Sequence, residues 1–394
     1  MPEAFKFTGW FLGCCFLLVI GVCSSFCGVL LGRCWLLLES RDPTLAQIKT
    51  RNPYALIGEK SFGQTGYAVA MLTLVIQLFG GAVVQLLLSA EMIKTLLQPL
   101  IQHHVHLTFC EWIVISGLIL LPLSFCGSPV DFSPIALFAM GSTSLAAVLI
   151  LVACFTNPAQ AVPEASPSFN VSPLTVLLGI GSVCFSFSGA ACMPTIHNDM
   201  KRKESFGFAV VLAYAVLILI YLPVSVVGYY QFGSETQSNI VRNLSPSLLT
   251  TGIQGLIAAH VLCAYLILLN PVNLNLENFL RIQHSFSWIR CLSRTGMTCL
   301  AVFVALSVPK FGKVLNLVGA SAVVFQSFIL PSFFYLRLTD SSAVARQTRL
   351  LLLVIMATAL LLGVASSASA LFDLVDPKAF TLPCYISSCD LETQ

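Results

Sequence analysis

Ten apolar stretches follow one another along this chain, and they constrain its fold more than any other feature. A helix that crosses the hydrocarbon core of a bilayer needs about 20 mostly apolar residues. Only 9% of the 394 residues are charged, whereas soluble domains carry roughly 25%. A water-facing surface cannot be built from so few charges, so the sequence predicts an all-α membrane protein with one domain over residues 1–394. The expected spans are 9–32, 67–90, 109–125, 132–155, 172–194, 206–230, 251–270, 294–309, 315–336 and 350–372.

The basic residues predict which loops face the cytosol. Fourteen of the 20 lysines and arginines lie in one set of alternating loops, the first of which is 33–66. Because Lys and Arg are retained on the cytoplasmic side, this set is expected in the cytosol and both termini outside. The two N-x-S/T sequons, at Asn170 and Asn243, fall in outer loops, where N-glycosylation takes place. Sequons also arise by chance, so they support this orientation without deciding it.

The chain has 15 cysteines, and most of them lie inside apolar runs. There we expect them to act as small buried hydrophobic residues. Cys384 and Cys389 are different, because they lie close together in the C-terminal tail. If the tail is outside the cytosol, the two predict a small disulfide loop.

Several classes of function lack their sequence features. The chain has no phosphate-binding loop, no metal-ligand spacing of Cys and His, and no set of nucleophile, base and orienting group. The net charge of +3 is small and spread out. We therefore expect no enzyme, no ATP-driven pump, no metal site, no cofactor and no nucleic-acid partner. The expected partners are the lipid bilayer and a small solute.

The fifth span is unusually rich in residues that weaken a helix. From Gly179 to its end it holds three glycines and three serines, and Pro194 is its last residue. Glycine and serine disfavour regular helical hydrogen bonding, and proline removes a donor. One interpretation is that the helix unwinds near Ser186–Gly189, and that its free carbonyl and N–H groups bind the ammonium and carboxylate of a solute. The alternative is close helix–helix packing through small residues.

Polar side chains in the middle of a span are rare and costly, so they are candidates for function. His260 lies near the middle of 251–270, and Gln77 lies in the second span. A histidine there can bind a proton or a solute; the alternative is a neutral ring bonded to a neighbouring backbone carbonyl. Gln77 either contacts the solute or bonds to another helix. Gln85 and Gln326 are weaker candidates of the same kind.

An ordered set of motifs resembles one known family. Phe185–Gly189 reads F-S-F-S-G, and Met193–Lys201 reads M-P-T-I-H-N-D-M-K. In this order they resemble the broken-helix motif of the amino acid/auxin permease family, also called the amino acid transporter transmembrane family, especially its invertebrate members. The resemblance covers essentially the whole chain. It continues in the segments 57–63, 221–223, 228–233, 239–240, 270–273, 276–277, 309–312 and 317–319.

The resemblance implies a LeuT-like bundle of eleven helices with two inverted repeats. It implies secondary active transport of amino acids, coupled to sodium or protons, by alternating access; the few charges favour neutral substrates. The family's helices 6, 3 and 8 correspond to 172–194, 67–90 and 251–270. The implied substrate-binding residues are Phe185, Ser186, Phe187, Ser188, Gly189, Gln77 and His260.

One departure from the family pattern concerns the start of the chain. Met1–Trp10 resembles the end of the family's first helix, so ten of the eleven helices are expected here. A truncated gene model is the favoured explanation, and a short isoform or a divergent member are the others. A non-transporting amino-acid sensor or an inactive paralogue is the alternative function. The expected location is the plasma membrane or an endolysosomal or vesicular membrane; the oligomeric state is left open.

Overall fold

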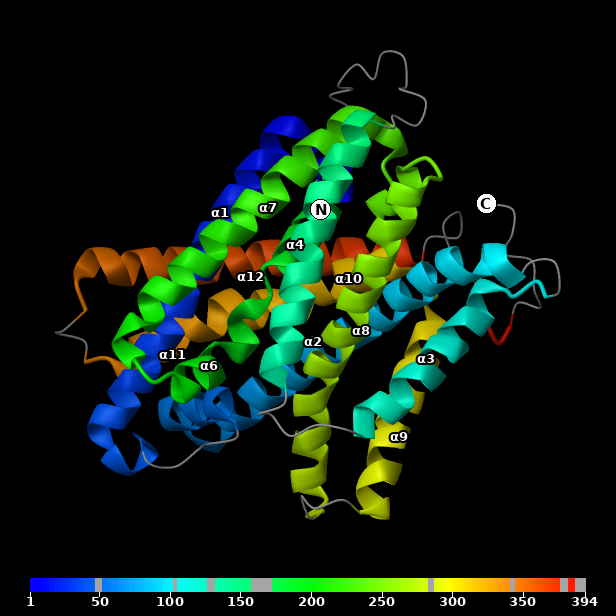
Figure 1. Ribbon diagram of the computed structural model, residues 1–394. Coiled ribbons are helices and arrows are strands. Elements are labelled where there is room, and N and C mark those ends of the chain that lie inside the picture. Colours follow the sequence, from blue (N-terminus) through cyan, green and yellow to red (C-terminus); the bar gives the residue numbers. More distant parts are fainter. Residues whose placement is uncertain are drawn as a thin grey trace.

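The computed structural model is a bundle of helices whose axes cross at varied angles (Figure 1). It describes residues 1–46, 52–101, 105–125, 132–156, 172–282, 287–340, 344–375 and 382–386. The α-helices in these ranges are α1 (Pro2–Arg41), α2 (Pro53–Ile101), α3 (Phe109–Phe125), α4 (Phe132–Thr156), α5 (Pro173–Ser186), α6 (Met193–Asp199), α7 (Phe206–Phe232), α8 (Leu248–Phe279), α9 (Trp288–Ser307), α10 (Phe311–Val318), α11 (Leu330–Leu338) and α12 (Arg346–Val375). Shorter helical turns are η1 (Pro43–Ala46), η3 (Gly189–Cys192), η4 (Lys203–Ser205), η5 (Gly233–Glu235), η6 (Ile240–Asn243), η7 (Gly319–Val323) and η8 (Phe325–Ile329).

The predicted spans are confirmed as helices. Among the described residues, nine helical segments are long and apolar enough to cross a membrane, and α3 is a shorter apolar helix. Two spans are much longer than their apolar cores, since α1 has 40 residues and α2 has 49. Both contain a sharp bend, at Gly9 with φ 73° and at Gly63 with φ 61°. A glycine adopts positive φ without the steric cost that a Cβ brings, so each bend joins a short helix to a long one.

The ion pairs agree with the predicted alternation of the loops. Each pair given by the described residues joins two groups that the loop assignment places on the same side of the membrane. On the predicted cytosolic side the pairs are Arg41–Asp340, Lys203–Glu39, Arg290–Glu277 and Arg294–Glu277. On the predicted outer side they are Arg242–Glu91 and Lys313–Asp373.

The helices form two main groups. Helices α1, α5 and α7 share one hydrophobic cluster, and α2, α3, α8 and α9 share another. In Figure 1, α1 and α7 lie on one side of the bundle and α3 and α9 on the other, and α2, a member of the second group, extends across the bundle. At its predicted cytosolic end the second group is held by a buried ion pair, because Arg294 Nε lies 2.6 Å from Glu277 Oε1 and Arg294 Nη1 donates to the Ser124 carbonyl at 2.6 Å.

The predicted Cys384–Cys389 disulfide is wrong, because Cys384 bonds to Cys110. The described part of the tail, residues 382–386, lies over the first turn of α3 and the end of α9, on the predicted outer side. There the Cys384 N–H donates to the Leu306 carbonyl at 2.9 Å, and the Tyr385 ring stacks on Phe303. This packing carries Cys384 to the first turn of α3. Cys389 lies outside the described residues.

Candidate functional site

The fifth span is broken where the sequence predicts. Helix α5 begins at a capping serine, Ser172, and ends at Ser186. Phe187 and Ser188 follow with non-helical backbone, and the tight turn η3 then leads into α6. Pro194 lies in the first turn of α6, where a missing N–H costs no hydrogen bond. The interruption near Ser186–Gly189 is therefore confirmed.

The break lies where four hydrophobic clusters meet. Cys184 belongs to the cluster of α1, α5, α10 and α12, and Phe187 to that of α1, α5 and α7. Ala190 packs into a third cluster, with α1, α2 and α11. The next residue, Ala191, packs into the cluster of α2, α3, α8 and α9. This short segment therefore touches every main group of helices and lies at the centre of the bundle.

Side chains from other helices donate hydrogen bonds to the carbonyl groups that the break leaves without helical partners. The Gln77 amide on α2 donates through Nε2 to the Ser188 carbonyl at 2.8 Å. The Tyr214 hydroxyl on α7 donates to the Phe187 carbonyl at 3.3 Å. A carbonyl buried in a membrane protein needs such a donor. The same oxygens are the groups that an ammonium ion from a solute would bind.

The break is closed on one side and accessible on the other. Phe187 is 1% exposed, and its ring lies against Tyr214 and Tyr221, with centroid distances of 6.1 and 5.7 Å. Two residues further on, Gly189 is exposed. A Cβ at Gly189 would make only ordinary contacts of 3.4 Å, with Met193 and Tyr214. A small solute therefore has access to the main chain at this point.

A second irregular span lies beside the break. Between α10 and α11 the chain forms two wide turns, η7 and η8, of π-helical type. Such turns often occur at functional sites. Residues of η8 lie next to η3, and η8 holds Gln326, which is 0% exposed. Neither amide atom of the Gln326 side chain has a hydrogen-bond partner, and the same is true of Gln77 Oε1. These atoms are further polar groups near the break.

The remaining predicted residues lie at different places. The Ser186 hydroxyl donates to the Ser182 carbonyl at 3.0 Å, within its own helix. Phe185, which belongs to α5, packs in the cluster of α1, α5, α10 and α12, beside Gly319. The His260 ring, on α8, is 3.0 Å from the Ala139 carbonyl on α4 through Nδ1. That contact is the one expected if the histidine is a neutral structural residue, and it directs the ring toward α4. The role of His260 in solute or proton binding stays a prediction.

The structure describes one of the two sequons, the one at Asn243. Asn170 lies outside the described residues. Asn243 ends the turn η6, where its Nδ2 donates to the Glu235 carbonyl at 2.9 Å and its Oδ1 accepts from the Gln237 N–H at 2.9 Å. A glycan on Nδ2 would have to coexist with or replace the first of these bonds. Glycosylation at either position stays a prediction.

The alternative interpretation of the small residues also holds for part of the same span. Gly181 packs directly on Gly319, since a Cβ at Gly319 would lie 2.1 Å from the Gly181 carbonyl oxygen. Next to them the Ser182 hydroxyl donates to Asn316 Oδ1 at 2.5 Å. Small residues thus bring α5 and the α10–η7 segment together, while the break itself starts five residues later.

Tyr214 and Tyr221 are the residues at the break that the sequence does not reveal. They lie in an apolar run, and although 221–223 belongs to the family resemblance, nothing in the run indicates a contact with the break. The central feature of the fold is a broken helix surrounded by long spans, with carbonyl groups that accept hydrogen bonds from the Gln77 amide and the Tyr214 hydroxyl.

A family model described as transmembrane amino acid transporter protein matches residues 1–372. The chain belongs to this family.

Curated relatives agree with the family match. The chain is 26% identical to the amino acid transporter AVT1C of Arabidopsis thaliana over 95% of its own length, and it spans 66% of the length of that relative. It is 27% identical to AVT3A of the same plant over 86% of its own length, which is 77% of that relative. The resemblance to the amino acid transporter transmembrane family is thereby confirmed. The chain is an integral, multi-pass membrane protein of a transporter family, not of an enzyme family.

Proposed function

We propose that this protein moves neutral amino acids across a membrane by secondary active transport, coupled to sodium or protons. The observation that carries the proposal is the break in the fifth span at the junction of four hydrophobic clusters. Broken helices near the middle of a transporter supply main-chain groups to both the substrate and the coupling ion. The names of the relatives, which are amino acid transporters, support the substrate class.

The substrate ammonium would take the place of two internal donors. In the present conformation Gln77 and Tyr214 donate to the Ser188 and Phe187 carbonyls. An ammonium group has three donors and can bond to both carbonyls if the two side chains rotate away. The Gln77 amide, once rotated away, and the free Nε2 of Gln326 would donate to the carboxylate.

The surroundings of the break favour a neutral substrate. Beside the purely apolar side chains of the clusters, Gln77, Met193, Tyr214 and Tyr221 contact it. None of them carries a charge at neutral pH, so a charged substrate side chain would be buried without a partner, which is costly. An uncharged aliphatic or small polar side chain can instead pack against the rings.

Alternating access would follow from movement of one helix group against the other. The group α2, α3, α8 and α9 is held at its cytosolic end by Arg294 and Glu277, which are 1% and 0% exposed. The pair that ties α1 to the segment between α6 and α7, Lys203–Glu39, is less buried, since its side chains are 22% and 11% exposed. We therefore assign the rocking movement to α1 and α5–α7 and the role of fixed scaffold to the second group.

Uptake into proteoliposomes tests the proposal. The purified full chain is reconstituted, and uptake of labelled alanine, lysine and glutamate is measured under a sodium gradient, a pH gradient and no gradient. We expect alanine to accumulate only under one of the two gradients. Binding of alanine without any accumulation would instead support the sensor function, and neither binding nor uptake of any amino acid would refute the proposal.

A further inference from the structure

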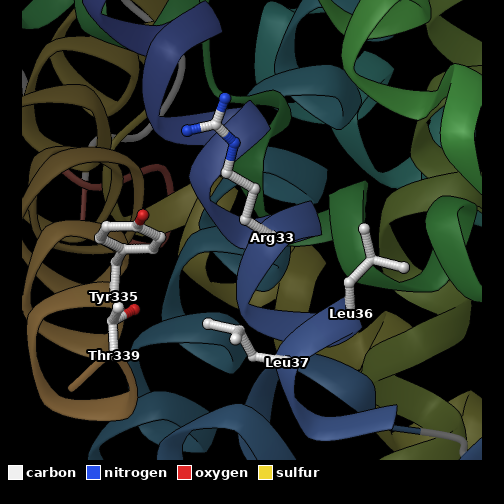
Figure 2. A pocket seen from close by; sticks show the side chains of 5 residues that line it. All are labelled: Arg33, Leu36, Leu37, Tyr335 and Thr339. Carbon is white, nitrogen blue, oxygen red and sulfur yellow. The ribbon is translucent and has the colours of Figure 1, made fainter. Parts of the chain in front are cut away.

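A hollow of about 410 Å³ lies between the predicted cytosolic ends of α1 and α11. Arg33, Leu36 and Leu37 line it from α1, and Tyr335 and Thr339 line it from α11 (Figure 2). Its size falls within the range of roughly 300–1,000 Å³ that is usual for small-ligand sites. It is remote from the break, because it lies on the outside of the helix pair and none of its lining residues contacts the break.

Three polar groups in the hollow have no bonding partner among the residues that the structure describes. The Thr339 hydroxyl oxygen is buried and has no hydrogen-bond partner. Within the described part of the chain, neither the Arg33 guanidinium nor the Tyr335 hydroxyl has a hydrogen bond or ion pair. Buried polar groups are normally bonded, so the Thr339 hydroxyl indicates a ligand that forms a hydrogen bond with it. The Arg33 side chain is exposed and the Tyr335 side chain is half-buried, so both can reach such a ligand at the opening of the hollow.

The position of Arg33 on its helix places the opening of the hollow toward lipid. Phe11 and Val22 are 77% and 61% exposed, as expected for side chains that face the acyl chains. The helical repeat of 3.6 residues puts Arg33 on the same face as these two residues, three turns beyond Val22. Leu36, on that face as well, is 42% exposed. The hollow therefore adjoins an apolar face of α1 along which acyl chains can lie, and it has a cation, Arg33, at its predicted cytosolic end.

The other arginine near this end of α1 is already engaged. Arg41 donates through Nη2 to the Leu338 carbonyl at 2.7 Å and lies 3.9 Å from Asp340. These contacts tie the end of α1 to the end of α11. Arg33 is thus left to bind a group from outside the protein.

We propose that this hollow binds the phosphate-bearing headgroup of an anionic phospholipid in the cytosolic leaflet. The planar guanidinium of Arg33 would hold two phosphate oxygens, and the Tyr335 and Thr339 hydroxyls would donate to the remaining oxygens. The acyl chains would lie along Leu36 and the apolar face of α1. The site is independent of the proposed transport reaction.

Lipid binding to the purified full chain tests this assignment. The protein is prepared in nanodiscs of phosphatidylcholine with increasing phosphatidylglycerol, and bound lipid is counted by native mass spectrometry after release. Arg33→Gln is expected to lower the apparent affinity for phosphatidylglycerol about fivefold or more, the effect of one cation near an anionic surface. The matched control is Arg349→Gln, which removes an exposed cation from the cytosolic end of α12, away from the hollow; its affinity should stay within about twofold of wild type.

Two further variants keep the test valid if Arg33→Gln folds poorly. Leu37→Trp fills the hollow and should reduce binding as strongly, and Thr339→Val should reduce it by about threefold, the value of a hydrogen bond. Equal loss in Arg33→Gln and Arg349→Gln would show only general surface attraction and would overturn the proposal. Inorganic phosphate that competes as well as phosphatidylglycerol would assign the site to a soluble anion and would also overturn it.

Discussion

Two glycines of the same span, Gly181 and Gly189, have opposite surroundings. Gly181 is buried, and a Cβ there would lie 2.7 Å from the Asn316 carbonyl oxygen. Gly189 is exposed, and a Cβ there would touch its neighbours only at 3.4 Å. The first glycine permits two helices to approach, whereas the second leaves space beside an unwound main chain. Small residues in one membrane helix can therefore serve packing at one end and access at the other.

The difference also separates stability from transport. A larger residue in the packed half of the span, around Gly181, should lower the free energy of unfolding. A larger residue in the open half, at Gly189, should leave the free energy of unfolding unchanged but fill the space that a solute needs. Substitutions at the two ends therefore test whether the break is a binding site or only an irregular part of a packed core.

The largest effect is expected at the glycine contact. In Gly319→Ala the new Cβ would lie 2.1 Å from the Gly181 carbonyl oxygen, so the helices must separate. We expect the free energy of unfolding to fall by about 3 kcal/mol, the upper end of the usual cost of overpacking. Chemical denaturation in detergent measures it. The control is Gly252→Ala on α8, where a Cβ would meet nothing within 4 Å; a loss of stability there of the same size would contradict the packing argument.

The next effect is on uptake. Gly189→Leu should fold with wild-type stability, because the backbone has room for a Cβ. Its side chain would occupy the accessible space at the break, and we expect uptake to fall about 100-fold, which corresponds to roughly 2.7 kcal/mol. Uptake in proteoliposomes and the melting temperature of the same preparation are the two measurements. Wild-type uptake by a folded Gly189→Leu protein would place the substrate elsewhere.

A smaller loss is expected when one internal donor is removed. Gln77→Ala deletes the amide that donates to the Ser188 carbonyl in the present conformation and that would donate to the carboxylate of the bound substrate. We expect uptake to fall about tenfold, or roughly 1.4 kcal/mol, the value of one hydrogen bond in a site. Gln85→Ala is the matched control on the same helix, because Gln85 carries a buried amide oxygen without a partner and has no described bond to the break. Similar losses in both variants would indicate a general effect on α2.

His260→Ala should have the smallest effect. The ring lies against the Ala139 carbonyl on α4 and is directed away from the break. We expect uptake to change by less than about threefold and stability to fall by about 1 kcal/mol, as for the loss of one hydrogen bond. A loss of uptake as large as that of Gln77→Ala would return His260 to the transport site.

Much of the fold can be predicted from the sequence because lipid imposes a simple length rule. The apolar runs predict the helices. The alternation of basic residues predicts which loops lie on the same side of the membrane, and therefore which charged side chains can form ion pairs. The break is predictable because Gly189, Ser188 and Pro194 weaken a helix locally. Local composition alone cannot tell Gly181 from Gly189, because the neighbours that distinguish them come from other helices.

Contacts between distant residues lie beyond such reasoning. The Tyr214 hydroxyl reaches Phe187 from a run that looks uniformly apolar, and only the packing of α1, α5 and α7 brings them together. The Cys110–Cys384 bond joins residues 274 positions apart. Proximity in sequence favoured Cys389 as the partner, whereas the path of the tail over α3 and α9 selects Cys110.

The accessibility of position 188 tests the central claim most directly. The variant Ser188→Cys is treated with a small thiol reagent in the purified protein, and modification of the peptide that holds this position is followed by mass spectrometry with and without alanine. If the unwound main chain holds the substrate, position 188 is modified and saturating alanine slows its modification, while lysine and glutamate do not. Modification at the same rate with and without alanine, in a protein that still takes up alanine, would contradict the account.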